Sequence, residues 1–144
     1  TLRVSSDRVI PKDVKMEVTN NDMFFYFDIE DGKPLPLRFH AQYYADDPLQ
    51  IESVRFVVNG FGYDFTPVNL PKTGKHGSRF YWETLDEELT AADKDLIYAL
   101  SHATWARVVF IGARGFSHVK KFTEDQIKDF YAVYALYLKM GGKF

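Results

Sequence analysis

The sequence predicts an α+β domain: a mostly antiparallel sheet of about seven or eight strands with two helices packed on it, the second a long C-terminal helix. Short runs of β-branched and aromatic residues fill the first two thirds of the chain, and turns rich in proline and glycine separate them. Two segments of helical periodicity follow, each opened by a threonine. Because the 144 residues include no linker-like stretch, we expect a single domain, residues 1–144.

The strands are predicted from how their residues alternate. An edge strand is expected over residues 12–18, and residues 23–29 (MFFYFDI) are apolar on both faces, as in a central strand covered on both sides. Residues 37–44 alternate between an apolar face and a polar face that carries His40, which predicts a half-buried strand. Further strands are expected over residues 51–58, 61–66 and 79–84, and a loop over residues 67–77.

Both helices begin at a threonine that can cap them. Thr90 opens the first helix, residues 90–103, and Asp93 lies where its carboxylate can reach back to the cap. Thr123 opens the second, residues 123–140, where Gln126 completes a capping box and Gly141 supplies a left-handed stop.

The second helix carries no charge between residues 130 and 138 (FYAVYALYL). One stripe is expected to pack on the sheet: Ile127, Phe130, Tyr131, Tyr134 and Leu138. The remaining apolar residues need another cover, either N-terminal strands or a partner: Val133, Leu136, Tyr137 and Met140. The C-terminal helix is therefore a candidate site of weak homo-oligomerisation.

The glycines of residues 106–122 (ARVVFIGARGFSHVKKF) are interpreted as turn residues. Residues 54–65 (VRFVVNGFGYDF) share the pattern of an arginine, an apolar run and two glycines, and Asn59-Gly60 is a strong hairpin indicator. Dinucleotide-binding, Walker and KH loops all need a different glycine pattern or a different flanking element. Residues 112–115 are thus expected to form a hairpin loop with Arg114 at its exposed tip.

Composition and motifs exclude several kinds of chemistry. The chain has no cysteine, which excludes disulfides, thiolate nucleophiles and cysteine-bound zinc, and its four histidines lack metal-ligand spacing. The acidic residues 86–88 are expected on the surface before a helix. We therefore expect no catalytic residue, no metal and no cofactor, and the net charge of -2 disfavours a nucleic-acid partner.

The aromatic residues, 17% of the chain, exceed what a core of this size needs. We expect a non-enzymatic binding or interaction module, with a protein or a glycan as its partner. The candidate contact residues are Tyr44, Phe61, Tyr81, Arg114 and Tyr137. Three alternatives remain open: carbohydrate binding by exposed aromatic rings, a hydrolase with a histidine–carboxylate site, and nucleic-acid binding through Lys72, Lys75, Arg79 and Arg114.

From about residue 51 onward, the chain resembles small domains of unknown function in exported bacterial lipoproteins. The resemblance lies in LTAADKDLIYALSHATWARVVFIGARGF and FTEDQIKDFYAVYALYLKM, and it implies an extracytoplasmic, non-enzymatic role. Because the chain begins at Thr1 and not at Met, we expect a processed or trimmed product, and a signal peptide, with or without a lipid anchor, is one candidate for the removed segment. No apolar run approaches the ~20 residues that span a bilayer.

Overall fold

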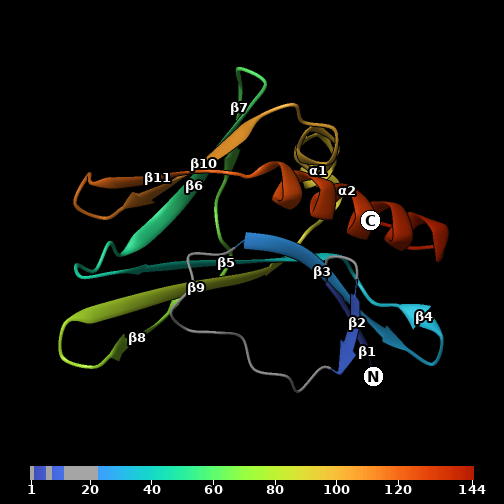
Figure 1. The fold of residues 1–144 in the computed structure, drawn as a ribbon, viewed down its shortest axis with the longest axis horizontal. Helices are drawn as coiled ribbons and strands as arrows, with labels where there is room; N and C mark the ends of the chain where they lie inside the picture. Colours follow the sequence, from blue (N-terminus) through green and yellow to red (C-terminus); the bar gives the residue numbers. More distant parts are fainter. Residues whose placement is uncertain (1, 6–7, 12–22) are drawn as a thin grey trace.

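The computed structural model describes residues 2–5, 8–11 and 23–144 (Figure 1). The strands of sheet A are β1 (Leu2–Ser5), β2 (Arg8–Pro11), β3 (Met23–Glu30), β4 (Lys33–Pro34), β5 (Arg38–Ala45), β8 (Lys72–His76) and β9 (Phe80–Glu88). The strands of sheet B are β6 (Ile51–Val58), β7 (Phe61–Phe65), β10 (Ala106–Gly112) and β11 (Ser117–Lys121). The helices are the short 3₁₀ turn η1 (Ala91–Asp93), α1 (Lys94–Ser101) and α2 (Glu124–Lys139).

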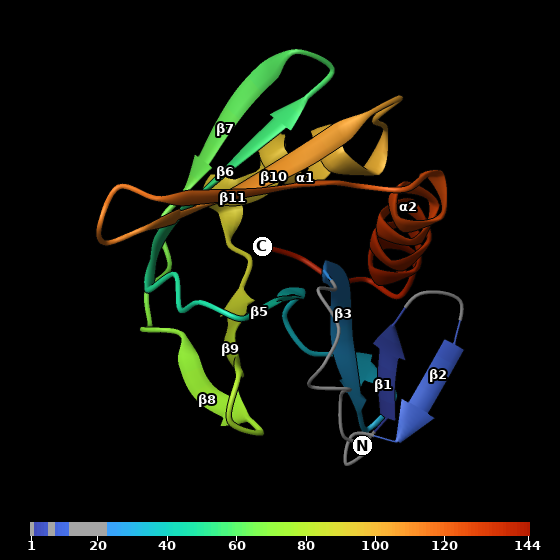
Figure 2. The same ribbon diagram turned by 60° about the vertical axis from the view of Figure 1, so that its left-hand side comes forward.

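The predicted α+β class, with antiparallel strands and a long C-terminal helix, is confirmed. Sheet A has the order β2-β1-β3-β5-β9-β8, with β4 added to β3, and sheet B has the order β11-β10-β6-β7. Figure 2 shows the two sheets as separate layers. The predicted loop over residues 67–77 is wrong in part, because Lys72–His76 pairs with β9 as strand β8. The strand predicted over residues 12–18 lies outside the described residues.

A buried carboxylate fixes the point where the chain first passes from sheet A to sheet B. Glu83 of β9 is 2% exposed and accepts hydrogen bonds from the backbone N–H groups of Leu49, Gln50 and Ile51, at 2.7, 3.0 and 2.8 Å. Leu49 and Gln50 belong to the turn between β5 and β6, where Gln50 has a φ of 59°, and Ile51 is the first residue of β6. The side chain of Glu83 in sheet A therefore fixes the backbone at the start of β6, the first strand of sheet B.

Aromatic side chains join the layers of the core. The rings of Phe39 in sheet A and Phe65 in sheet B lie 4.8 Å apart, and the ring of Phe25 lies 4.7 Å from that of Phe130 in α2. All four of these side chains are buried. The core therefore lies where the two sheets and α2 meet. The opposite face of sheet A does not contribute to this aromatic core.

The sheet-facing stripe of α2 differs from the predicted one. Its buried residues are Ile127, Phe130, Val133 and Tyr137. Tyr131 and Leu138, which were expected to face the sheet, are exposed. The stripe is rotated because α2 packs against both β3 and α1, so the buried arc is set by two neighbours. The capping box of Thr123 and Gln126 is confirmed, with bonds of 2.9 and 3.1 Å.

Both predicted hairpins are confirmed. Asn59 and Gly60 have φ values of 49° and 88°, the left-handed conformation that their two-residue turn requires. In the β10–β11 hairpin, the N–H of Gly112 donates to the carbonyl of Phe116 at 2.9 Å. Gly115 there has a φ of 80°. Gly115 is therefore a turn former, as the comparison with residues 54–65 predicted, whereas Gly112 ends strand β10 and lies too close to the Leu49 carbonyl for a Cβ.

Candidate binding pocket

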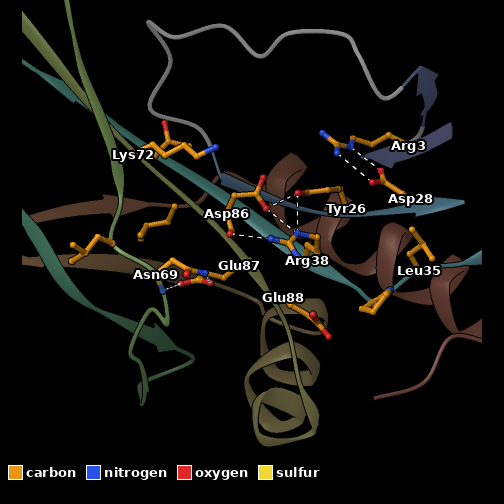
Figure 3. Close-up of a pocket in the computed structure, with 14 residues that line it drawn as sticks. Arg3, Tyr26, Asp28, Leu35, Arg38, Asn69, Lys72, Asp86, Glu87 and Glu88 are labelled. Carbon is orange, nitrogen blue, oxygen red and sulfur yellow. Dashed lines mark hydrogen bonds and ion pairs between the residues drawn. The ribbon is translucent and has the colours of Figure 1, made fainter. Parts of the chain in front are cut away.

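The polar face of sheet A carries a pocket of about 480 Å³ (Figure 3). Strands β1, β3, β5, β8 and β9 all contribute to its lining. Because side chains alternate along a strand and the register pairs Tyr26 with Arg38 and His40 with Asp86, these polar residues share one face. Five strands that are distant in sequence thus present polar groups to one space.

The centre of the pocket is a hydrogen-bonded group formed by Tyr26, Arg38 and Asp86. The Tyr26 hydroxyl donates to Asp86 Oδ1 at 2.5 Å, and Arg38 Nε lies 3.0 Å from the same oxygen and 3.1 Å from the Tyr26 hydroxyl. Arg38 Nη2 also donates to the backbone carbonyl of Asp86 at 3.1 Å. The guanidinium is therefore held by two strands, β3 and β9, that flank its own.

These contacts set the protonation states of the group. Burial by itself would raise the pKa of Asp86, but contacts with His40, Tyr26 and Arg38 outweigh it and lower the pKa to about 2. Burial and the hydrogen bond to Asp86 raise the pKa of Tyr26 well above its ordinary value. At neutral pH the pocket floor therefore holds a carboxylate, a guanidinium and a protonated phenol.

A second arginine is positioned in the same way beside the first. Arg3 Nε and Nη2 donate to Asp28 Oδ1 and Oδ2 at 2.9 and 3.4 Å, and the Arg3 guanidinium carbon lies 4.3 Å from the centre of the Tyr26 ring. Burial lowers the pKa of Arg3, but the contact with Asp28 outweighs it and raises the pKa. Asp28 therefore orients Arg3, and Asp86 orients Arg38. The two arginines lie on either side of Tyr26.

The remaining charged groups of the pocket differ in how they are compensated. Glu87 accepts hydrogen bonds from the backbone N–H and the side-chain amide of Asn69, at 3.1 and 3.4 Å, and Figure 3 shows its carboxylate directed to Asn69. Lys72 and Glu88 are exposed. Neither forms a hydrogen bond or ion pair with another residue in the described ranges 2–5, 8–11 and 23–144. Among the described residues, the charges of the lining that have no partner are thus the cation of Lys72 and the carboxylate of Glu88.

His40 does not complete a histidine–carboxylate pair of the kind that a hydrolase uses. Its Nδ1 lies 3.9 Å from Asp86 Oδ2, beyond hydrogen-bond reach, and its ring stacks on Phe24 with centroids 5.0 Å apart. The prediction of a half-buried strand is wrong here, because His40 on its polar face is 8% exposed. Its neighbours on β3 and β9 cover it.

No family model matches the chain. Comparisons with curated proteins and with solved structures also gave no match. No helix in the described part of the chain is long and apolar enough to cross a membrane. Within the same residues, no three histidine, aspartate or glutamate side chains gather as metal ligands would. The site is therefore interpreted from its own geometry.

None of the five residues predicted as contacts lines this pocket. Tyr44 is half-buried and stacks on Phe80, with centroids 5.3 Å apart. Tyr81 is half-buried on the other face of β9 and lies under Lys75 Nζ at 5.1 Å. Phe61 is 70% exposed at the start of β7. Tyr44 and Tyr81 thus lie on opposite faces of sheet A, and Phe61 lies in sheet B.

The other two predicted contacts are engaged within the fold. Tyr137 is 1% exposed, and its hydroxyl donates to the carbonyl of Lys143 at 2.6 Å. Its prediction as a contact is therefore wrong: it is a core residue whose hydroxyl ties down the C-terminus. Arg114 is exposed but directs Nη2 to the carbonyl of Pro48 at 3.2 Å, so its side chain is anchored to the β5–β6 turn.

Sequence reasoning missed the residues that form the pocket. Strand β9 continues to Glu88, four residues beyond its predicted end, so Asp86 lies within a strand and not in a surface run before a helix. Residues 85–88 (LDEE) carry three acids in succession and no apolar–polar alternation, so the local sequence gives no signal for this extension of the strand. The hydrogen bond between Asp86 and Tyr26 joins residues that are 60 positions apart, so no local sequence pattern predicts it.

Proposed function

We propose that the protein is a non-enzymatic binding module whose ligand places one oxyanion group, a carboxylate or a phosphate, in the pocket of sheet A. The observation that carries this proposal is the arrangement of Arg3 and Arg38 on either side of Tyr26. Each arginine is oriented by its own aspartate, as in sites where a second residue fixes a binding side chain.

The two arginines keep donors for a ligand. Nε and Nη2 of each guanidinium bind protein oxygens, and Nη1 of each has no hydrogen-bond partner among the described residues. Guanidinium groups bind carboxylate and phosphate well because their donors lie in a fixed plane. Lys72, at the opposite side of the pocket in Figure 3, adds a positive charge. The Nη1 donors of the two arginines and the ammonium of Lys72 are therefore the groups that would bind an oxyanion.

The carboxylates of the lining restrict the rest of the ligand. Asp28 and Asp86 are neutralised by the arginines, whereas Glu88, opposite Arg38 in the strand register, is not. A second anionic group near Glu88 would be repelled. The remainder of the ligand is accordingly uncharged or cationic, and a volume of about 480 Å³ suits a small molecule or a terminal residue of a larger one.

An NMR titration tests this proposal. Sodium phosphate, sodium sulfate and sodium acetate are added separately at constant ionic strength, and the Nε–Hε signals of Arg3 and Arg38 are followed. Both signals should shift, and Lys72→Gln should weaken binding roughly tenfold because it removes a charge-assisted contact. Lys75→Gln, on the same strand outside the pocket, should leave binding unchanged. Equal effects of the two variants, or no shift of either arginine, would contradict the proposal.

Carbohydrate binding is the second candidate, favoured by a separate hollow at the β8–β9 hairpin. This hollow of about 330 Å³ is lined by residues that include Tyr81, Trp82, Gln50 and Thr73. Aromatic rings beside hydrogen-bonding groups are suited to sugars. Titration with neutral oligosaccharides, followed by tryptophan fluorescence, should show saturation that Tyr81→Ala abolishes and Tyr131→Ala, on α2, does not. An unchanged response in Tyr81→Ala would remove this candidate.

The expected cellular setting stays a prediction. Export, a lipid anchor and an extracytoplasmic location rest on the sequence resemblance alone. Weak self-association through the C-terminal helix also stays a prediction, and the exposed side chains that would serve it are Tyr131 and Leu138.

A further inference from the structure

Sheet B has one face in the core and one face turned outward. Val108 and Phe110 of β10 point inward and are buried, whereas their neighbours Arg107 and Val109 point outward. The outward face continues on β11, where register places Val119 beside Val109 and Lys121 beside Arg107. Val119 is 54% exposed. This part of the surface therefore combines aliphatic and cationic side chains.

Arg107 and Lys121 form a pair of like charges that does not stabilise the fold. They lie directly opposite each other on one face of an antiparallel pair, where like charges destabilise the sheet. Arg107 contacts the ring of Trp105, 6.0 Å from its centre, and neither cation has an acidic partner among the described residues. Asp64, the acid on the same face, is bound by Arg55 at 2.8 Å. An external carboxylate would relieve the repulsion.

The backbone beside this pair is open. Strand β11 is the last strand of sheet B in the order β11-β10-β6-β7, and Figure 2 shows it along the edge. Gly112 N–H bonds to Phe116 and Phe122 N–H bonds to Ala106, each at 2.9 Å. Because antiparallel bonding alternates, His118 and Lys120 direct their backbone groups to β10. The backbone groups of three residues therefore point to the free edge: Ser117, Val119 and Lys121.

We propose that β11 takes up an extended acidic segment of another polypeptide as an additional antiparallel strand. Such strand addition gains its affinity from backbone hydrogen bonds and its specificity from alternate side chains. The incoming strand would set a carboxylate against Lys121 and Arg107, an aliphatic residue against Val119 and a polar residue against Ser117. This surface lies on the other sheet from the oxyanion pocket and does not depend on it.

A second copy of the chain is a poorer occupant of the edge. Its own β11, SHVKK, would bring two more lysines and no carboxylate, so the repulsion between Arg107 and Lys121 would persist. The like-charge pair thus discriminates against self-pairing, as lysines on exposed edge strands commonly do.

The probe is the blocked peptide Ac-Glu-Thr-Val-Thr-Thr-NH₂, with a control peptide in which lysine replaces glutamate. Amide signals of Ser117, Val119 and Lys121 should shift and gain protection from exchange with the first peptide, more strongly at low salt. Val119→Pro should abolish binding, because it removes an N–H that points to the free edge where proline is tolerated. Val119→Thr retains that N–H and should bind as the parent does.

Reversal of the charge at Lys121 distinguishes strand addition from other modes of peptide binding. Lys121→Glu should weaken the glutamate peptide about fivefold and favour the lysine peptide instead. Three results would overturn the proposal: no shift of the edge amides, binding that Val119→Pro leaves intact, or concentration-dependent self-association of the parent that Val119→Pro removes. Adsorption to anionic vesicles that Val119→Pro leaves unchanged, with no peptide response, would instead assign the cations to a membrane surface.

Discussion

Replacement of Asp86 by asparagine should remove a part of the folding stability that depends on pH. The pKa of Asp86 lies at about 2, below its ordinary value of 3.8. At about 1.4 kcal/mol per pH unit, full conversion of this difference would give about 2.4 kcal/mol. The Asp86 side chain is 40% exposed, so solvent screening reduces the contribution to about 1 kcal/mol.

The sign follows from the lowered pKa. The unfolded chain takes up a proton on Asp86 at higher pH than the folded chain, so the contribution is present above pH 3.8 and is lost as the pH falls toward 2. Urea unfolding followed by tryptophan fluorescence, repeated from pH 7 to the acid limit of folding, measures this dependence. Asp86→Asn should lose about 1 kcal/mol of its pH dependence relative to the parent.

The control is Asp46→Asn, at an exposed position in the β5–β6 turn, which should follow the parent within about 0.5 kcal/mol. If Asp86→Asn and the parent lose stability in parallel as the pH falls, Asp86 is not held ionised by Arg38 and Tyr26. The description of the pocket floor would then be wrong.

Three further substitutions test contacts that hold turns in place, each by the free energy of unfolding in urea. Glu83→Ala should destabilise by about 3–5 kcal/mol, because three buried N–H donors lose a charged acceptor, whereas Glu88→Ala should stay within about 0.5 kcal/mol. Asn59→Ala should cost about 1–2 kcal/mol by removing the acceptor that binds Thr104 and Trp105, and Asn59→Asp should retain most of it. Gly112→Ala should cost about 1–3 kcal/mol, since its Cβ would lie 2.2 Å from the Leu49 carbonyl oxygen. Any of the three alanine variants matching the parent would show that the contact in question carries no stability.

Local patterns were sufficient for most of the strands, for both helices and for the hairpin turns, but not for β8, which lies in a predicted loop. The strand at residues 37–44, the capping box of Thr123 and the pair Asn59-Gly60 each depend on chemistry within a few residues, and the structure confirms the strand, the cap and the turn. The half-buried character predicted for that strand is wrong, because His40 and Gln42 on its polar face are buried. The same patterns could not show that the strands divide between two sheets. That division depends on the buried Glu83, whose three partners lie more than 30 residues away.

The pocket was beyond sequence reasoning for a related reason. Arg38 and His40 on the polar face of β5 indicate solvent when β5 is considered alone, because a half-buried strand has one wet face. The register with β3 and β9 instead sets Tyr26 and Asp86 beside them. Long-range register depends on which strands pair, and the composition of each strand does not determine that.

A crystal structure of the protein grown in sodium phosphate tests the proposed function most directly. The predicted result is a phosphate within hydrogen-bond distance of Arg3 and Arg38, with Lys72 turned toward it and Asp28 and Asp86 in place. A phosphate that instead binds at Arg107 and Lys121, with only water between the two pocket arginines, would contradict the assignment of the pocket as the ligand site.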